Sequence, residues 1–353
     1  MVVSHSPWPL YCPDLALAQQ WLLDAWGQAA ELPWGLAMLG PSLGLLEESA
    51  TLLAQQPERL RYPLDRHMAF RLARGAGAAN PYAALLPEPI QEADHAWLEA
   101  IQAAGAPLAV ELVGGIGDHL EQLSLMLPWA EERQQPLVVF MTPERQAQLE
   151  RVLAGRAGVT LGQRASGDAA GASKAMNLRG LISARGEAHY GCWIPCPPRQ
   201  ARHQLVCCWR ASGQDAPHSA WCRSVPFALV ETFYRRLLAG GRPGSSIVDL
   251  SHWQPWETRA LEALGIQRHN PAEGDVLALA ERVAGSQVIT IDTALAHLCA
   301  AMGQPAWVLL PRFPDERWVE LHRPQHCYGQ VLQLQRQSSY GDWSSTLETL
   351  PIN

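Results

Sequence analysis

Gln287-Val-Ile-Thr-Ile-Asp-Thr-Ala-Leu-Ala-His-Leu-Cys-Ala-Ala-Met-Gly-Gln-Pro-Ala-Trp-Val-Leu-Leu310 is the stretch that decides the fold. Its β-branched opening, 288–291, leaves no polar face and predicts a strand buried on both sides. The Ala- and Leu-rich segment 294–302 predicts a helix, which ends at Gly303. Residues 306–310 form a second apolar run. Together they predict a strand–helix–strand unit of a parallel sheet.

The turn between this strand and this helix is a natural phosphate site. In such units the helix begins at the carboxyl end of the strand, where free N–H groups and the helix dipole favour an anion. Asp292, Thr293 and His297 lie at or just inside this end. We expect Thr293 and the backbone N–H groups of Ala294 and Leu295 to hold phosphate oxygens. Two roles stay open for His297: a hydrogen bond to the same phosphate, or packing with partners inside the protein.

Length and composition indicate a globular protein of two or three domains. The chain has 353 residues, of which 48% are hydrophobic and 17% charged. A net charge of −7 gives no long-range attraction to nucleic acid or anionic lipid. No apolar run approaches a membrane span, and the first residues do not resemble a signal peptide, so we expect a cytoplasmic protein with no integral membrane segment.

The eight cysteines are therefore expected to be reduced thiols. Cys192 and Cys196 have a spacing that could suit zinc. No second compact cysteine pair at structural-zinc spacing accompanies them, which favours loop and core cysteines over a metal site.

The opening stretch and the residues after it resemble the C-terminal signature of family 9 glycosyltransferases, the heptosyltransferase-like enzymes. The family pattern reads roughly D-T-A-x-A-H-L-A-G-A-x-G-x-P-x-W-x-L-L-P, and the branch often fused to tetratricopeptide repeats is the most similar. The match continues through Pro311, Pro314-Asp315, Arg317-Trp318 and Gly341-Asp342-Trp343. The resemblance implies an α/β protein of the GT-B fold, in which two Rossmann-like domains face a cleft. The alternative is an unrelated doubly wound protein that shares only the strand–helix–strand unit.

A glycine-rich turn follows another strand, expected at 108–113. Gly114-Gly-Ile-Gly-Asp118 resembles the G-x-G-D opening of family 9 enzymes, whose Asp lies at the mouth of the cleft and is assigned as the catalytic base. The resemblance makes Asp118 the candidate base and places Gly115 and Gly117 at the substrate site. An N-cap carboxylate is the other role open to Asp118. Leu120 stands where the dinucleotide fingerprint has its third glycine, which disfavours an NAD(P)-linked oxidoreductase.

The chain divides into three expected regions. Residues 1–106 read as helical, with a faint resemblance to a degenerate tetratricopeptide repeat and with helices expected at 14–29, 34–46, 47–55, 65–74 and 91–104. Residues 107–202 are expected to form an N-terminal Rossmann-like acceptor-side domain, with surface loops over 154–173. Residues 203–353 are expected to form a C-terminal Rossmann-like domain that binds the nucleotide sugar. A helical cap is favoured for the first region over a docking surface for an acceptor or partner.

Sugar transfer from a nucleotide diphosphate requires a neutralised leaving group, a base for the acceptor hydroxyl and substrates held together. No Asp-x-Asp pair occurs in the chain, so we expect an enzyme that needs no metal and no cofactor beyond its nucleotide-diphosphate sugar donor. Arg223 and Ser224 precede a helix expected at 227–239, and Arg312 and Arg317 follow the opening stretch. These arginines are the candidates for neutralising the diphosphate.

Departures from the family pattern keep a second function open. Where related chains carry N-D-R-x-R-S, this one reads Ser219-Ala-Trp-Cys-Arg223-Ser224 and keeps only the last arginine. Ala294 replaces a glycine of the strict heptosyltransferases, and the lysine of that region is missing. The expected function is a metal-independent hexosyl- or heptosyltransferase whose acceptor is a glycan, lipid or protein. The alternative is a catalytically silent binding or scaffold protein of the same fold.

Overall fold

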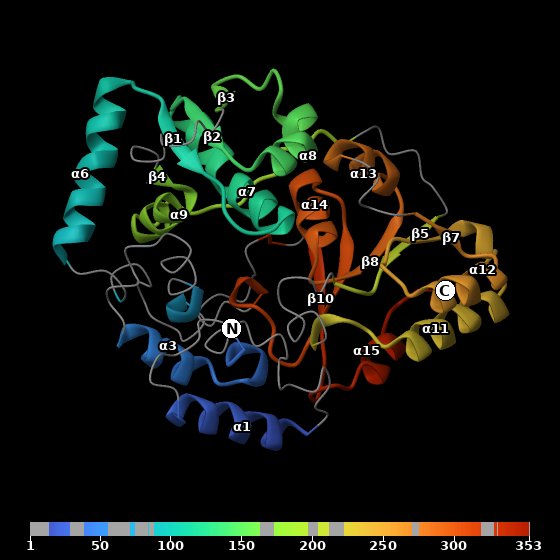
Figure 1. Cartoon of the computed structure of the whole chain (residues 1–353). Helices are drawn as coiled ribbons and strands as arrows, with labels where there is room; N and C mark the ends of the chain where they lie inside the picture. The colour runs from blue at the N-terminus through green and yellow to red at the C-terminus, as the bar shows by residue number, and fades with distance from the viewer. Residues whose placement is uncertain are drawn as a thin grey trace.

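The strands form two separate parallel sheets in a mixed α/β arrangement, which confirms the α/β part of the expected fold class (Figure 1). The computed structural model describes residues 14–28, 39–55, 71–74, 84, 88–162, 173–196, 204–211, 222–269, 275–318, 328–329 and 331–352. In these segments, no helix is both long and apolar enough to cross a membrane.

The first sheet has the strand order β3-β2-β1-β4. Its strands are β1 (Leu108–Glu111), β2 (Leu137–Phe140), β3 (Val159–Leu161) and β4 (Ser173–Lys174), and its helices are α7 (Ile116–Glu132), α8 (Pro143–Leu153) and α9 (Ala175–Ala184). The expectation of loops throughout 154–173 was wrong, because β3 pairs with β2 inside that range. β3 has only three residues and none of them is fully buried, so its sequence carries too short an apolar run to reveal a strand.

The second sheet has the strand order β10-β9-β8-β5-β6-β7. Its strands are β5 (Leu205–Cys208), β6 (Ile247–Asp249), β7 (Gln267–Arg268), β8 (Gln287–Ile291), β9 (Ala306–Leu310) and β10 (Leu332–Arg336). The strand order reverses direction between β5 and β8, and in open α/β sheets ligands bind outside the carboxyl ends of the strands at such a point.

Helices cover both faces of the second sheet. They are α11 (Phe227–Ala239), α12 (Pro255–Ala263), α13 (Val276–Val283), α14 (Ala294–Met302) and α15 (Ser344–Glu348). Leu205 and Cys207 pack in one core cluster with α11, α12 and α15, whereas Val206 and Cys208 pack in the other with α13 and α14. Successive side chains of β5 enter the two clusters in turn, because neighbouring residues of a strand point to opposite faces of the sheet.

The unit β8–α14–β9 has the bounds that its sequence predicts. Four of the five β8 residues are buried, as a central parallel strand requires. α14 is buried over nearly its whole length and packs against α7 from the first sheet's half. It ends at Gly303, whose φ of 65° is the left-handed conformation that glycine adopts without a steric penalty.

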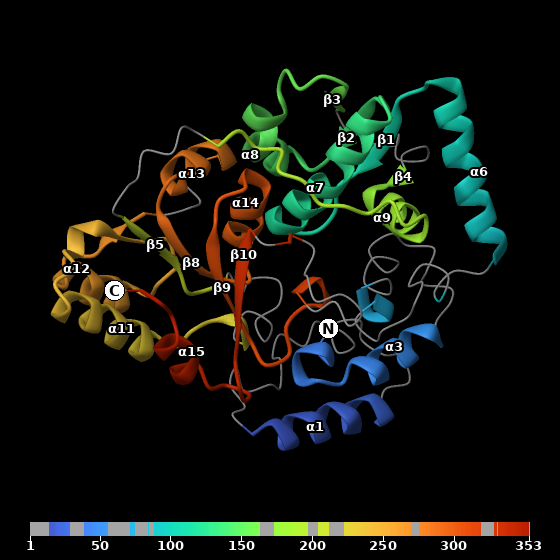
Figure 2. The same ribbon diagram turned by 180° about the vertical axis from the view of Figure 1, so that it is seen from behind.

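The described N-terminal elements are α1 (Leu15–Gln28), the short 3₁₀ helix η1 (Pro41–Leu43), α3 (Leu46–Ala54) and α6 (Glu88–Ala104). Figure 2 shows α1 and α3 close together and away from the strands. The helix expected over 34–46 is wrong from residue 39 on, and 34–38 lie outside the described residues. Gly44, with φ of 80°, ends η1, and a Cβ on it would lie 2.8 Å from the Phe313 ring. This region therefore packs directly against the loop that follows β9.

Candidate functional site

The first turn of α14 lies at the carboxyl end of β8. Thr293 is the N-cap residue, yet its side chain makes no cap hydrogen bond to the helix. Its Oγ1 lies 3.0 Å from Oγ1 of Thr290 and 3.9 Å from the sulfur of Cys208. Because Thr293 does not cap the helix, its hydroxyl leaves the N–H groups of Ala294 and Leu295 to another acceptor.

Arg223 lies against the same turn. Its Nη1 donates to the carbonyl oxygen of Asp292 at 3.0 Å and lies 3.5 Å from that residue's Oδ2. The Asp292 side chain is buried, whereas that of Arg223 is 29% exposed. Ser224 holds the preceding segment, since its Oγ accepts from the backbone N–H of Ala211 at 3.1 Å. Only the family resemblance led us to expect Arg223 at the diphosphate site. In the structure, Arg223 contacts Asp292, the residue that precedes Thr293.

The glycine-rich turn after β1 leads directly into α7, which begins at Ile116. Asp118 is therefore a first-turn residue of α7, and its Oδ2 accepts from the backbone N–H of Gly115 at 2.8 Å. The N-cap residue is Gly115, so Asp118 is not the N-cap carboxylate that was open beside catalysis; it is the N3 residue, and its carboxylate accepts from the N-cap N–H. Gly114 has φ of 96°, and a Cβ there would lie 2.6 Å from Asp118 Oδ2. Glycine at this position thus lets the carboxylate close over the turn.

Gly117 lies where the first turn of α7 contacts the first turn of α14. A Cβ on Gly117 would lie 3.0 Å from Cδ2 of His297 and 3.3 Å from Cα of Ala294. The first turns of α7 and α14 are therefore in contact. α7 follows a strand of the first sheet and α14 follows a strand of the second, and the two helices are far apart in the sequence. Asp118 and the Thr293 turn consequently share one site.

Arg317 joins both sides of this site. It belongs to the 3₁₀ turn η6 (Glu316–Trp318), and its side chain is 6% exposed. Its guanidinium lies 2.8 Å from Oδ1 of Asp118, 2.9 Å from Oε2 of Glu121 and 2.9 Å from Oδ1 of Asp315. A buried cation is stable only when it is paired in this way. Asp315 also pairs with Arg71, so the N-terminal region reaches the same network.

Glu121 and Arg179 are site residues that sequence reasoning missed. They pair at 2.9 Å, and each side chain is only 1% exposed. Tyr190 adds a hydrogen bond to Oε1 of Glu121 at 3.3 Å. Glu121 lies one helical turn after Asp118, and this i, i+3 spacing is the signal that could have found it. Nothing in the sequence around Arg179 points to this contact.

His297 has protein partners on both ring nitrogens. Nδ1 lies 2.6 Å from the Tyr328 hydroxyl, and Nε2 lies 3.3 Å from Nη1 of Arg317. Burial, followed by the charge of Arg317, lowers the pKa of His297 to about 4. The ring is therefore neutral at pH 7, and because arginine only donates, Nε2 accepts and Nδ1 carries the proton. This arrangement matches the packing role rather than a direct contact with phosphate.

Arg312, the remaining sequence candidate, is exposed at the carboxyl end of β9. Its backbone N–H donates to Oε1 of Gln337 at 3.0 Å, and its carbonyl accepts from Nε of Arg336 at 2.8 Å. It is Arg317 that contacts both Asp118 on α7 and His297 on α14. Within the described segments, no group of three or more His, Cys, Asp or Glu side chains is placed to hold a metal ion.

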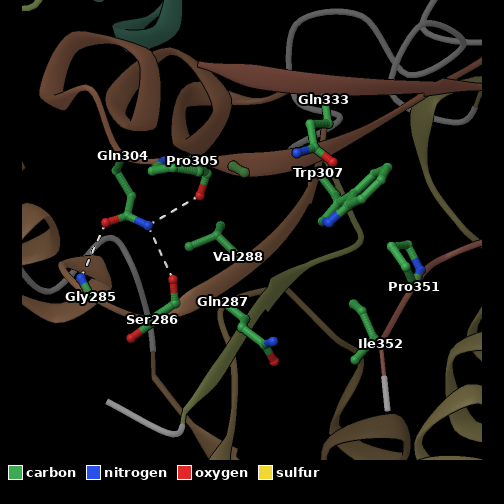
Figure 3. Close-up of a pocket in the computed structure, with 11 residues that line it drawn as sticks. Gly285, Ser286, Gln287, Val288, Gln304, Pro305, Trp307, Gln333, Pro351 and Ile352 are labelled. Atoms are coloured by element: carbon green, nitrogen blue, oxygen red, sulfur yellow. Dashed lines mark hydrogen bonds between the residues drawn. The ribbon is translucent and has the colours of Figure 1, made fainter. Parts of the chain in front are cut away.

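A pocket of about 360 Å³ lies elsewhere, at the amino ends of β8 and β9 (Figure 3). Gln287, Trp307 and Gln333 line it. Gln304 fixes one wall, because its side chain bonds the backbone of Gly285, Ser286 and Pro305. This pocket opens at the opposite strand ends from Thr293 and is separate from the candidate site.

Comparison with known proteins gives structural likenesses at low identity. No family model and no curated protein matches the chain. Among solved structures, it is similar to an E. coli heptosyltransferase, WaaC, with ADP (12% identity, TM-score 0.43, 69% of this chain and 96% of that one). It is also similar to a dodecameric iron-containing glycosyltransferase, TibC, from enterotoxigenic E. coli (14%, 0.42, 68% and 65%). A third likeness is a family 9 glycosyl transferase from Veillonella parvula (9%, 0.40, 65% and 86%).

Proposed function

We propose that this protein is a glycosyltransferase that moves a sugar from a nucleotide-diphosphate donor to an acceptor hydroxyl without a metal ion. The contact between the first turns of α7 and α14 carries the proposal. It brings a carboxylate, Asp118, to the helix start at Thr293, and Arg223 lies on the same turn. An anion-binding helix start beside a carboxylate is what transfer from a diphosphate donor requires.

In the proposed reaction, the acceptor oxygen bonds to the anomeric carbon as the bond from that carbon to the β-phosphate oxygen breaks. The acceptor proton passes to Asp118, and the nucleoside diphosphate leaves with the bonding electron pair. Thr293, the N–H groups of Ala294 and Leu295, and Arg223 hold the leaving group. These groups supply hydrogen bonds and positive charge without a metal.

The pairing of Asp118 with Arg317 adds a requirement. A carboxylate held at 2.8 Å by a guanidinium is a weaker base than a free one. At 25% exposure, the side chain of Asp118 is the most accessible of the three carboxylates around Arg317. The donor diphosphate therefore takes the place of Asp118 on Arg317, which frees the base and supplies a second cation for the leaving group.

The proposed architecture follows the same logic. The strands of the first sheet all come from within 107–202, and those of the second all come from within 203–353. We assign these ranges to two Rossmann-like domains in the GT-B arrangement, with 1–106 as a helical region packed beside them. The acceptor is a glycan, lipid or protein hydroxyl, and the protein works in the cytoplasm.

A non-catalytic binding protein of the same fold is the second candidate, and one observation favours it. Arg317 already faces three carboxylates, so no charge there is left over for a diphosphate unless a partner moves.

Thermal-shift and calorimetric titrations with nucleoside diphosphates, nucleotide sugars and NAD(P)H test the proposal. A ligand at 100 times its Kd stabilises the folded state by about 2.7 kcal/mol. We expect this for a nucleoside diphosphate and not for NAD(P)H; absence of nucleotide binding contradicts the proposal.

A further inference from the structure

Three aromatic side chains lie together at the carboxyl edge of the second sheet. Phe227 is the first residue of α11, Trp253 lies in the connection after β6, and Trp256 is in the first turn of α12. Helices that follow parallel strands begin at the carboxyl ends of those strands. The cluster therefore lies on the same edge as the Thr293 turn.

The cluster is preorganised rather than loose. Phe227 makes edge-to-face contacts with Trp253 at 5.3 Å and with Trp256 at 5.1 Å between ring centroids. Trp253 is fixed by its Nε1–H, which donates to Oδ1 of the buried Asp249 at 2.9 Å. The guanidinium of Arg210 lies 5.7 Å from the centre of the Trp253 ring and pairs with Glu257 at 3.0 Å. The two supporting rings thus hold their positions before any ligand arrives.

Trp256 is the third ring of the cluster, and its side chain is not buried in a core. Its side chain is 57% exposed, and in the part of the chain that the structure describes it is the one aromatic residue among the large exposed hydrophobic side chains. Packing explains Phe227 and Trp253, which are half-buried. It does not explain an indole that faces water on a rigid support, which is what a stacking platform offers.

The platform lies within a nucleotide's reach of the proposed diphosphate site. Arg223, which bonds the carbonyl oxygen of Asp292, precedes Phe227 by four residues, a span of at most about 14 Å. When the phosphates of a nucleotide contact the Thr293 turn, its base lies farther from that turn, along the carboxyl edge of the second sheet. We propose that Trp256, supported by Phe227 and Trp253, stacks the base of the bound nucleotide; this rests on the proposed function. Stacking on an aromatic ring tolerates any base, because every base has a π-face.

Isothermal titration tests the platform with ADP, GDP, UDP, CDP and inorganic pyrophosphate. Trp256→Ala should weaken binding of the best nucleoside diphosphate about ten-fold or more, the range of base–aromatic stacking, and leave pyrophosphate unchanged. Trp256→Phe should recover most of the loss. Leu17→Ala is the matched control, since Leu17 is also exposed, at 62%, but lies in α1.

Each other outcome overturns the inference at an identifiable point. If wild type binds no nucleoside diphosphate, the proposed function fails and the platform fails with it. If wild type binds one and Trp256→Ala binds it equally well, the nucleotide site stands and the platform is wrong. Equal losses for pyrophosphate and nucleotide would mean that the variant disturbs the phosphate site instead.

Discussion

Replacing Arg317 by methionine tests the charge network that joins the two halves of the site. Methionine keeps much of the side-chain volume, so the main change is the loss of a cation facing Asp118, Glu121 and Asp315. Removing one partner of a buried ion pair costs about 3–5 kcal/mol. The lower end applies here, because Glu121 keeps Arg179 at 2.9 Å while Asp118 and Asp315, at 25% and 20% exposure, can reach water. We expect the free energy of unfolding to fall by about 3 kcal/mol.

Urea denaturation followed by circular dichroism measures this loss. Arg235→Met is the control, because Arg235 pairs with Glu231 at 2.6 Å on an exposed helix face and should cost at most about 0.5 kcal/mol. The double variant Arg317→Met/Asp118→Asn also removes the carboxylate that Arg317→Met leaves without its cation. Its free energy of unfolding should therefore fall by less than the sum of the two single-variant losses, with a difference of about 0.5–3 kcal/mol. An Arg317→Met protein as stable as the control, with an additive double variant, would refute the network.

Three further predictions concern the same site. Thr293→Ala with Arg223→Ala should weaken binding of a nucleoside diphosphate by about 2–4 kcal/mol while the bare nucleoside binds as before, since only the phosphates lose charge-assisted hydrogen bonds; calorimetry showing equal losses would contradict this. Gly117→Ala should lower the free energy of unfolding by about 1–3 kcal/mol, because its Cβ would press on His297 and Ala294, whereas Gly27→Ala, with nothing within 4 Å, should not destabilise the protein. Because the pKa of His297 is lowered from 6.5 to about 4, protonation favours the unfolded chain. Between pH 6.5 and 4 the free energy of unfolding should therefore fall by about 2.5 kcal/mol more in wild type than in His297→Gln; parallel pH profiles would contradict the buried neutral ring.

The strand–helix–strand unit around Thr293 could be read from the sequence because its signals are local. β8, α14 and β9 are bounded by residues whose role depends on their neighbours alone: the apolar runs, Thr293 at the helix start and the left-handed Gly303. The same holds for α8, which begins at Pro143 after the N-cap Thr142. Long, strongly patterned elements with clear ends are predictable in this way.

The rest of the site depends on contacts between distant segments. Glu121, Arg179 and Arg317 come from three regions of the chain and meet only because α7, α9 and η6 pack together. No local pattern encodes that meeting. The same limit applies to Gly44, whose close approach to Phe313 depends on how the N-terminal region packs. The local pattern indicated Thr293 and the resemblance to a known family indicated Asp118 and Arg223, but neither predicted that Arg317 holds Asp118.

Release of nucleoside diphosphate from a panel of nucleotide-diphosphate sugars tests the central claim most directly. The assay runs in EDTA, with water or with added glycan, lipid and protein fractions as acceptors, on wild type and Asp118→Asn. We predict that wild type turns over at least one donor at a rate that EDTA does not change. Asp118→Asn should lower turnover by roughly 10²–10⁴-fold without weakening nucleotide binding. Full turnover in Asp118→Asn, or nucleotide binding with no turnover of any donor, would contradict the account.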